Sequence, residues 1–204
     1  NNQTTTCPTN ILDNTAKTLI DNHTWNTGAP KGDDSTIVNR ETGALNTVPF
    51  YKAERGNETG KIYSSATGCS VTGCNDTVTR KTTWTGYVAL PYVTDWAYAS
   101  SESVCETNMY AGYNATASFP VEAFANMTCK KNNWMQRSSY TWYLSPSAYG
   151  SYANNAWYVS GDGAADFNRA ACSYAVAPSI YLKSNVLIES GNGTSSNPYM
   201  LKTS

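Results

Sequence analysis

The sequence predicts a mixed α+β protein built from short antiparallel strands, flanking helices and long loops. Helical spacing appears near the start of the chain, where Ala16, Leu19 and Ile20 recur on one side of a helix. Short runs of β-branched and aromatic residues, separated by turns, dominate the last third. Helices early and strands late in one chain are typical of the α+β class.

The first half of the chain predicts two helical pieces separated by a loop. A short helix is expected over 13–25, and Asp13 or Asn14 can cap its N-terminus. Residues 26–49 are rich in Gly, Asp, Thr and Asn and contain prolines, so we expect a loop with at most one short strand. A helical turn is expected over 48–56, where a glycine ends it.

The second half predicts extended segments separated by turns. Alternating β-branched and aromatic residues predict strands within 61–65 and 76–93, and a short helix is expected over 94–101. Residues 105–135 predict a loop region closed by cysteines, with a helical piece over 121–127. The remaining strand candidates are 141–146, 156–161, 173–182 and 186–191.

Size, charge and composition narrow the function classes. The chain has 204 residues, of which 14% are charged, and its net charge is -1. A nucleic-acid partner would require a clustered basic face, and membrane binding would require a basic amphipathic helix or an apolar run of roughly 20 residues. The sequence contains neither pattern. Scarce Lys and abundant Asn, Thr, Ser and Tyr are common in exported bacterial proteins, so we expect an extracellular or cell-surface location. For the domain organisation, we expect a polar lead-in over 1–12 and a single domain over 13–204.

The six cysteines indicate an oxidising compartment. A zinc site would require CxxC or Cys/His pairs, and the chain has no CxxC and one histidine. The first expected pair lies in a tight Gly-flanked loop, and the second brackets a region with few large aliphatic side chains. We therefore expect two disulfides, Cys69–Cys74 and Cys105–Cys129. Three alternatives stay open for Cys7 and Cys172: a pair with each other, free thiols, or pairing of Cys7 with an upstream segment.

Long segments of the chain carry a family resemblance. They include "AKTLIDNHTWNTG" (16–28), "CNDTVTRKTTWTGYVALPYVTDWAYAS" (74–100), "CKKNNWM" (129–135) and "SYAVAPSIYLKSNVLIESGNGTSSNPYML" (173–201). Together they resemble exported, often pilin-like proteins of gut Gram-positive bacteria with a C-terminal domain related to C-type lectins and sulfatase-modifying factors. The resemblance implies a C-type lectin-like fold with a closing hairpin at the C-terminal end. Ala177 departs from the family pattern, which usually has Arg at this position.

Candidates for catalysis or metal binding are few. His23 is the only histidine, and we expect a surface or capping role for it. Asp162 and Asp166 lie in "GDGAADF", which predicts a turn-rich loop with solvated carboxylates and not a glycosidase pair. The resemblance implies a copper-binding cysteine pair in the related oxidases, and only Cys172 lies in the corresponding region. The EPN, QPD and WND motifs of calcium-binding lectins are absent. We therefore expect no enzyme activity, no metal and no cofactor.

The stretch from Ala148 to Ala175 predicts a binding face. It combines Tyr and Trp with Ser, Gly, Asn and Asp, which is the composition of an antibody paratope. The expected ligand is an unidentified protein or glycan. The candidate ligand-binding residues are Tyr140, Tyr143, Tyr149, Tyr152, Asn154, Asn155, Tyr158, Asp162, Asp166, Asn168 and Arg169.

Strand alternation divides the rings of this region into two sets. In 141–146 it predicts that Trp142 and Leu144 face the core and that Tyr143 faces outward. In 156–161 it predicts that Trp157 and Val159 face inward, with Tyr158 outward. The alternative is a Tyr-rich core with ordinary loops.

Two functional hypotheses follow for the whole chain. The first is a non-enzymatic, adhesin-like display module on the cell surface whose binding face lies within 140–173. Its composition over 148–173 also fits the output of a diversity-generating retroelement, which converts AAC codons into codons for the residues found there. The alternative is a structural, pilin-like subunit that forms a homo-oligomer or filament with a lectin-like outer shell.

Overall fold

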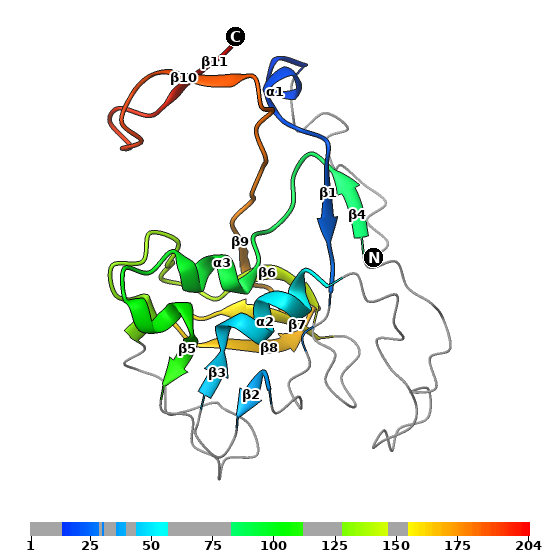
Figure 1. Cartoon of the computed structure of the whole chain (residues 1–204), viewed down its shortest axis with the longest axis vertical. Helices are drawn as coiled ribbons and strands as arrows, with labels where there is room; N and C mark the ends of the chain where they lie inside the picture. Colours follow the sequence, from blue (N-terminus) through cyan, green and yellow to red (C-terminus); the bar gives the residue numbers. More distant parts are fainter. Residues whose placement is uncertain are drawn as a thin grey trace. The chain divides into compact units, whose positions relative to one another are not determined.

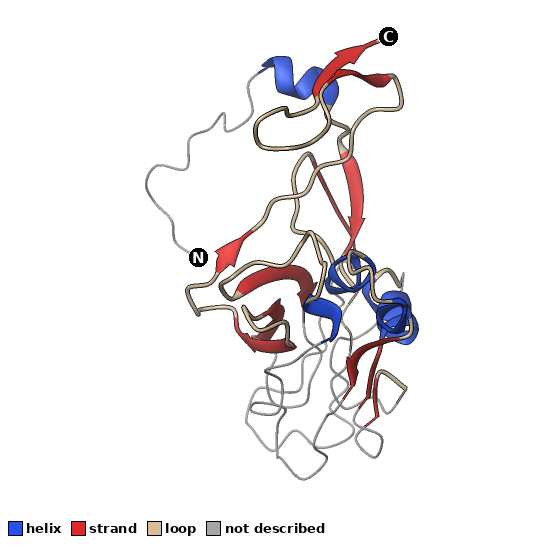
Figure 2. Ribbon diagram, turned by 90° about the vertical axis from the view of Figure 1, so that its left-hand side faces the viewer, coloured by secondary structure: helices blue, strands red, loops and turns tan. Residues whose placement is uncertain are grey.

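The computed structural model describes residues 14–28, 30, 36–39, 44–56, 83–111, 128–146 and 155–204. Within them the chain is a mixed arrangement of α and β structure with mostly strands and few helices, as the α+β class predicts (Figure 2). None of the described helices is long and apolar enough to cross a membrane. The contacts divide the chain into two compact units: unit 1 (Asn1–Thr24, Thr85–Val88, Ser179–Ser204) and unit 2 (Trp25–Trp84, Ala89–Pro178). The single domain over 13–204 stays a prediction.

Unit 2 contains the four-stranded sheet that holds most of the aromatic residues. The strand order is β8-β7-β6-β9, in which β7 pairs antiparallel with both β6 and β8, while β6 and β9 are parallel (Figure 1). The strands are β6 (Thr141–Pro146), β7 (Asn155–Val159), β8 (Ala165–Arg169) and β9 (Ala175–Val176). The prediction of a turn-rich loop through Asp166 was wrong, because Ala165–Arg169 pairs along the whole of β7.

Two short helices cover one face of this sheet. They are α2 (Thr47–Glu54) and α3 (Val93–Tyr98), followed by the 3₁₀ turns η1 (Ser103–Glu106) and η2 (Thr128–Lys130) (Figure 1). Phe50 of α2 and Trp96 of α3 are fully buried, and the Phe50 ring meets the Trp157 ring edge-on at 4.7 Å between centroids. A second sheet of order β2-β3-β5 is antiparallel and consists of β2 (Val38–Asn39), β3 (Ala44–Asn46) and β5 (Asn108–Ala111).

The side chains that face the core confirm the predicted inward and outward positions in β7, whereas those in β6 are the reverse of the prediction. Trp157 and Val159 of β7 are buried, as predicted. In β6 the phase is opposite: Tyr143 is buried, whereas Trp142 and Leu144 are only partly buried. Polar side chains explain the error, because the inward positions on either side of Tyr143 hold Thr141 and Ser145, both buried.

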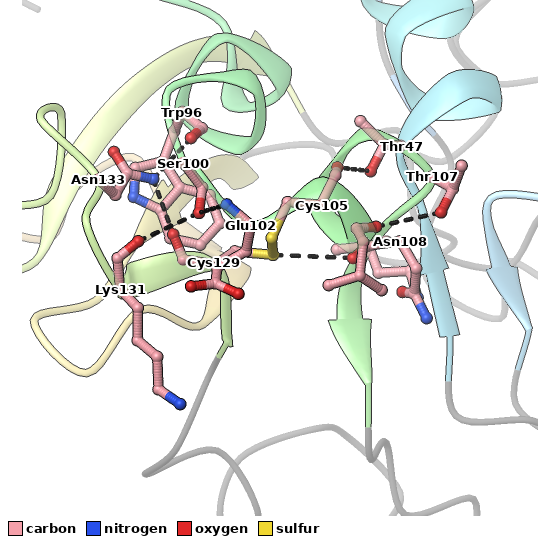
Figure 3. Close-up of a disulfide and its surroundings, with 12 residues drawn as sticks. Thr47, Trp96, Ser100, Glu102, Cys105, Thr107, Asn108, Cys129, Lys131 and Asn133 are labelled. Atoms are coloured by element: carbon pink, nitrogen blue, oxygen red, sulfur yellow. Dashed lines mark hydrogen bonds between the residues drawn. A yellow bond between two sulfur atoms is a disulfide. The ribbon is translucent and has the colours of Figure 1, made fainter.

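The predicted disulfide between Cys105 and Cys129 is present, with Cα atoms 5.6 Å apart (Figure 3). It joins η1 to η2, and Asn133 extends the link by donating from Nδ2 to the carbonyls of Trp96 (2.7 Å) and Cys129 (2.8 Å). The Thr47 hydroxyl donates to the Cys105 carbonyl at 2.7 Å. Both half-cystines are buried and belong to the hydrophobic core of unit 2, so the bridge links two short 3₁₀ turns within that core.

The other cysteine predictions have different outcomes. Cys69, Cys74 and Cys7 lie outside the described residues. Cys172 is a free, partly exposed thiol in the structure.

Unit 1 contains α1 (Asn14–Leu19) and the antiparallel hairpin of β10 (Val186–Ser190) and β11 (Met200–Thr203). The predicted helix over 13–25 is shorter than expected, because His23–Asn26 forms strand β1 instead and pairs with β4 (Thr83–Gly86). The strand predicted over 186–191 is confirmed. Lys183 ties the hairpin to α1, since its ammonium group donates to the carbonyls of Lys17 (3.1 Å) and Thr18 (2.9 Å).

Candidate functional site

The face of the four-stranded sheet opposite the helices carries a group of aromatic and polar side chains. Strand register sets their order: Trp142 of β6 lies opposite Tyr158 of β7, and Tyr158 lies opposite Asp166 of β8. Alternation places these three side chains on the face away from Trp157. We name this group the outer-face cluster and define it as Tyr140, Trp142, Tyr158, Asp166, Asn168 and Tyr174.

The four rings of the outer-face cluster pack against one another. Tyr140 and Tyr174 precede β6 and β9, and their rings stack at 5.0 Å between centroids with 22° between planes. The Trp142 ring lies 4.5 Å from that of Tyr174. Tyr158 meets its neighbours edge-on, at 5.5 Å from Tyr140 and 5.0 Å from Tyr174. Edge-to-face and offset pairs at these distances stabilise a ring cluster.

The cluster has a graded exposure. Tyr158 is buried among the other rings, and Trp142 and Tyr174 are partly buried. Tyr140 is half exposed, at 50%. Two hydrogen bonds fix the partly buried rings: Trp142 donates from Nε1 to the Cys172 carbonyl (3.3 Å), and Asn168 donates from Nδ2 to the Tyr174 hydroxyl (2.9 Å). The result is a rigid aromatic base with one ring open to solvent.

Asp166 supplies the formal charge of the cluster. Its carboxylate accepts hydrogen bonds from the Tyr158 hydroxyl (3.2 Å, at Oδ2) and from the Phe167 amide (2.7 Å, at Oδ1). Burial raises the pKa of Asp166 to about 6, although both hydrogen bonds lower it. Burial and the neighbouring Asp166 charge raise the pKa of Tyr158, so this phenol keeps its proton. Near neutral pH the cluster therefore carries a negative charge beneath neutral rings.

The predicted site residues fall into three groups. Tyr140, Tyr158, Asp166 and Asn168 come together in the outer-face cluster. Tyr149, Tyr152 and Asn154 lie outside the described residues. The other four lie elsewhere. Tyr143 and Asn155 are buried on the core face of the sheet. Arg169 is on the same face as Phe167 but is exposed at the end of β8, and Asp162 is exposed in the turn between β7 and β8.

Two of these placements correct the sequence analysis. Tyr143 is not available to a ligand, because it is 3% exposed and packs in the core. The prediction that Asp166 is solvated was wrong, since strand β8 buries it against Tyr158, whereas Asp162 is exposed as predicted.

Sequence reasoning missed Trp142 and Tyr174 as members of the site. The sequence predicts that Trp142 faces the core when the large apolar residues of 141–146 are taken as the inward positions of the strand. The pairing of Tyr140 with Tyr174 depends on the parallel β6–β9 contact, in which the Ala175 amide donates to the Tyr140 carbonyl (2.9 Å). No local pattern encodes a contact between segments more than thirty residues apart.

A second polar cluster of unit 2 surrounds the buried carboxylate of Glu54, at the end of α2. Glu54 accepts hydrogen bonds from the Ser145 and Thr94 hydroxyls (2.5 Å each) and from the Val93 amide (2.8 Å). Arg55 adds a contact to Glu54 (3.3 Å) and one to Asp95 (2.5 Å). Burial raises the pKa of Glu54 to about 7, against the lowering effect of the two hydroxyls and Arg55. We name this group the Glu54 hub, and its contacts join α2, α3 and β6.

The Arg55 guanidinium of the hub lies between two rings. Its central carbon is 4.0 Å from the ring centroid of Tyr51 and 4.0 Å from that of Tyr92. Two carboxylates and two aromatic faces thus contact one partly buried cation.

No family model, curated protein or solved structure matches this chain. The functional argument therefore rests on the two clusters. In the part of the chain that the structure describes, no three His, Cys, Asp or Glu side chains lie close enough together to hold a metal ion. His23 lies in unit 1, where its ring contacts that of Tyr181 at 3.9 Å between centroids and its Nδ1 lies 3.2 Å from Asp21 Oδ2.

Proposed function

We propose that this chain is a non-enzymatic, extracellular display module, adhesin-like, that binds a protein or glycan ligand through the outer-face cluster. One observation carries the proposal: Tyr140 is half exposed, and its ring rests on partly buried rings that are themselves held by hydrogen bonds. Exposed Tyr and Trp side chains on a rigid base are the usual hot spots of binding surfaces.

The location outside the cell is supported by the disulfide between Cys105 and Cys129. Disulfides form and persist in oxidising compartments, which include the cell surface. The proposed C-type lectin-like fold is supported by small sheets with flanking helices and by the closing hairpin β10–β11. The proposed relationship to exported pilin-like proteins, with retroelement diversification of 148–173, is tested by searching the gene neighbourhood for a reverse transcriptase and an imperfect repeat of this coding region.

A binding screen tests the proposed function. The intact protein is applied to glycan and protein arrays next to two variants, Tyr140→Ala and Trp134→Ala. Trp134 is the matched control, because it is an aromatic side chain of unit 2 with 75% exposure and no part in the cluster. We expect ligands that the wild type and Trp134→Ala bind and that Tyr140→Ala loses. Ligands retained by Tyr140→Ala would place the binding surface elsewhere.

The structural alternative is a subunit of a homo-oligomer or filament, and a second surface favours it. The hairpin β10–β11 exposes Leu187 (48%), Ile188 (60%) and Met200 (56%). Leu187 and Ile188 lie on opposite faces of the hairpin, so both of its faces expose an apolar side chain that a partner could cover. Light scattering of the wild type and Ile188→Glu over a range of concentrations tests this alternative, which requires a wild-type oligomer that the variant lacks.

A further inference from the structure

The outer-face cluster lacks a component that the Glu54 hub contains. Both groups combine aromatic faces with a buried carboxylate, and the hub also contains the Arg55 guanidinium between two rings. Among the described residues, no basic side chain lies over the rings of the outer-face cluster, and Asp166 has no ion pair. The contacts of Asp166 are the Tyr158 hydroxyl and the Phe167 amide, which are neutral donors.

The charge and geometry of the cluster are complementary to a planar cation. Aromatic faces attract a cation within about 6 Å of a ring centroid, and a nearby carboxylate adds Coulomb attraction in a partly dry environment. A guanidinium also stacks flat on a ring, which an ammonium group cannot do. The Tyr140 ring stacks nearly parallel to that of Tyr174 and is 50% exposed, so a planar group from solvent can reach the Tyr140 ring.

We propose that the outer-face cluster is a receptor site for an arginine side chain of a protein partner, with the guanidinium stacked on the exposed Tyr140 ring and the Asp166 carboxylate as the opposite charge. This inference rests on the proposed display function and assigns the chemistry of its ligand. The Arg55 site of the same chain provides the internal example of rings and carboxylates that bind one guanidinium.

The test compares arginine with its neutral isostere. The full-length chain is titrated with the blocked tripeptide Gly-Arg-Gly, with the same peptide containing citrulline, and with Gly-Lys-Gly. The readout is the NMR shift of the Trp142 indole N–H, which lies in the cluster, while the buried indole N–H of Trp157 is the internal reference. We expect saturable shifts at Trp142 and binding of the arginine peptide about tenfold tighter than that of the citrulline or lysine peptide.

Variants locate the effect in the cluster. Asp166→Asn retains the size of the side chain and removes its charge, and Tyr140→Ala removes the exposed ring. Each should weaken arginine binding about tenfold, whereas Trp134→Ala should bind as the wild type does. Equal binding of arginine and citrulline, or an unchanged affinity in Asp166→Asn, would overturn the assignment.

The failure of this inference is distinguishable from the failure of the proposed function. If array ligands depend on Tyr140 but the arginine peptide leaves the Trp142 resonance unshifted, the display function stands and the arginine assignment falls. The same holds if maltotriose, a neutral oligosaccharide, shifts this resonance and the arginine peptide does not. If no array ligand depends on Tyr140, the display function falls.

Discussion

Two clusters of aromatic rings in unit 2 contain a buried carboxylate, and within the described residues only one of them also contains a cation. In the Glu54 hub, Arg55 lies between Tyr51 and Tyr92 and contacts two carboxylates. In the outer-face cluster, the carboxylate of Asp166 lies beside Tyr158 on the neighbouring strand and has only neutral hydrogen-bond donors.

We propose that this difference separates a structural role of the hub from a binding role of the outer-face cluster. The hub joins α2, α3 and β6 through hydrogen bonds and one cation that converge on the Glu54 carboxylate, so removal of Arg55 should cost stability. In the outer-face cluster, the Asp166 carboxylate is buried without a charged partner among the described residues, and Tyr140 is half exposed, so we expect the Tyr140 ring to contribute little to folding. A buried charge without a charged partner costs stability, and such a cost is typical of functional sites.

Trp157→Ala sets the scale, because this ring is on the core face and is 2% exposed. Removing it leaves a cavity beside Phe50, and we expect a loss of about 3–5 kcal/mol in the free energy of unfolding. Trp142→Ala, on the outer face of the same sheet, should cost clearly less, since Trp142 is only partly buried. Urea denaturation measures both variants, and equal losses would erase the distinction between the two faces.

Arg55→Met removes the cation of the hub while it keeps most of the aliphatic side chain. The fully buried Glu54 carboxylate then loses its charged partner, which typically costs about 3 kcal/mol for a buried pair. Urea denaturation at pH 8, where Glu54 is ionised, measures the loss. A variant as stable as the wild type would show that the hydroxyl and amide donors satisfy Glu54 without Arg55.

The pH dependence of stability reports on Glu54. Its pKa is 4.5 before folding and about 7 in the folded protein, so the folded state binds the proton more tightly. The contribution of Glu54 is therefore most favourable below about pH 4.5 and decreases as the pH rises to about 7. Thermal unfolding of the wild type and of Glu54→Gln between pH 4 and 8 tests this pH dependence. The stability of the wild type relative to Glu54→Gln should fall as the pH rises from about 4.5 to about 7 and level off at higher pH.

Asp166→Asn should change the free energy of unfolding only slightly, and in the direction opposite to the loss expected for Arg55→Met. Burial disfavours the Asp166 charge, and no described cation compensates it, so a neutral amide should leave stability unchanged or raise it by up to about 1 kcal/mol at pH 8. Chemical denaturation of this variant is the measurement. A loss above 2 kcal/mol, well beyond that of ordinary surface changes, would make Asp166 part of the structural framework.

The sequence predicted where several strands lie better than it predicted which of their side chains face the core. β6, β7 and β10 coincide with the expected strands, because β-branched and aromatic runs between turns are local signals. β8 was missed, since Ala, Asp and Asn have low β-propensity and pairing with β7 is what makes Ala165–Arg169 a strand.

The candidate site was predicted in part for the same reason. The Tyr and Trp content of 140–174 was visible, so four members of the cluster were named in advance. Their grouping was not visible, because it depends on strand register and on the parallel β6–β9 pair. Ser145 shows the limit most clearly, since this polar residue marks a core-facing position only through its bond to Glu54, 91 residues earlier in the chain.

The central claim is that the outer-face cluster binds a ligand and contributes little to folding, and Tyr140→Ala tests both halves in one protein. We predict that its free energy of unfolding falls by no more than about 1 kcal/mol, because Tyr140 is half exposed and the variant loses only its ring contacts with Tyr158 and Tyr174. We also predict that its affinity for the array ligand falls at least about tenfold, as for a central aromatic hot spot. The measurement is a urea titration alongside a binding titration of the same preparation. A variant that loses stability as Trp157→Ala does, or that binds as tightly as the wild type, would contradict the claim.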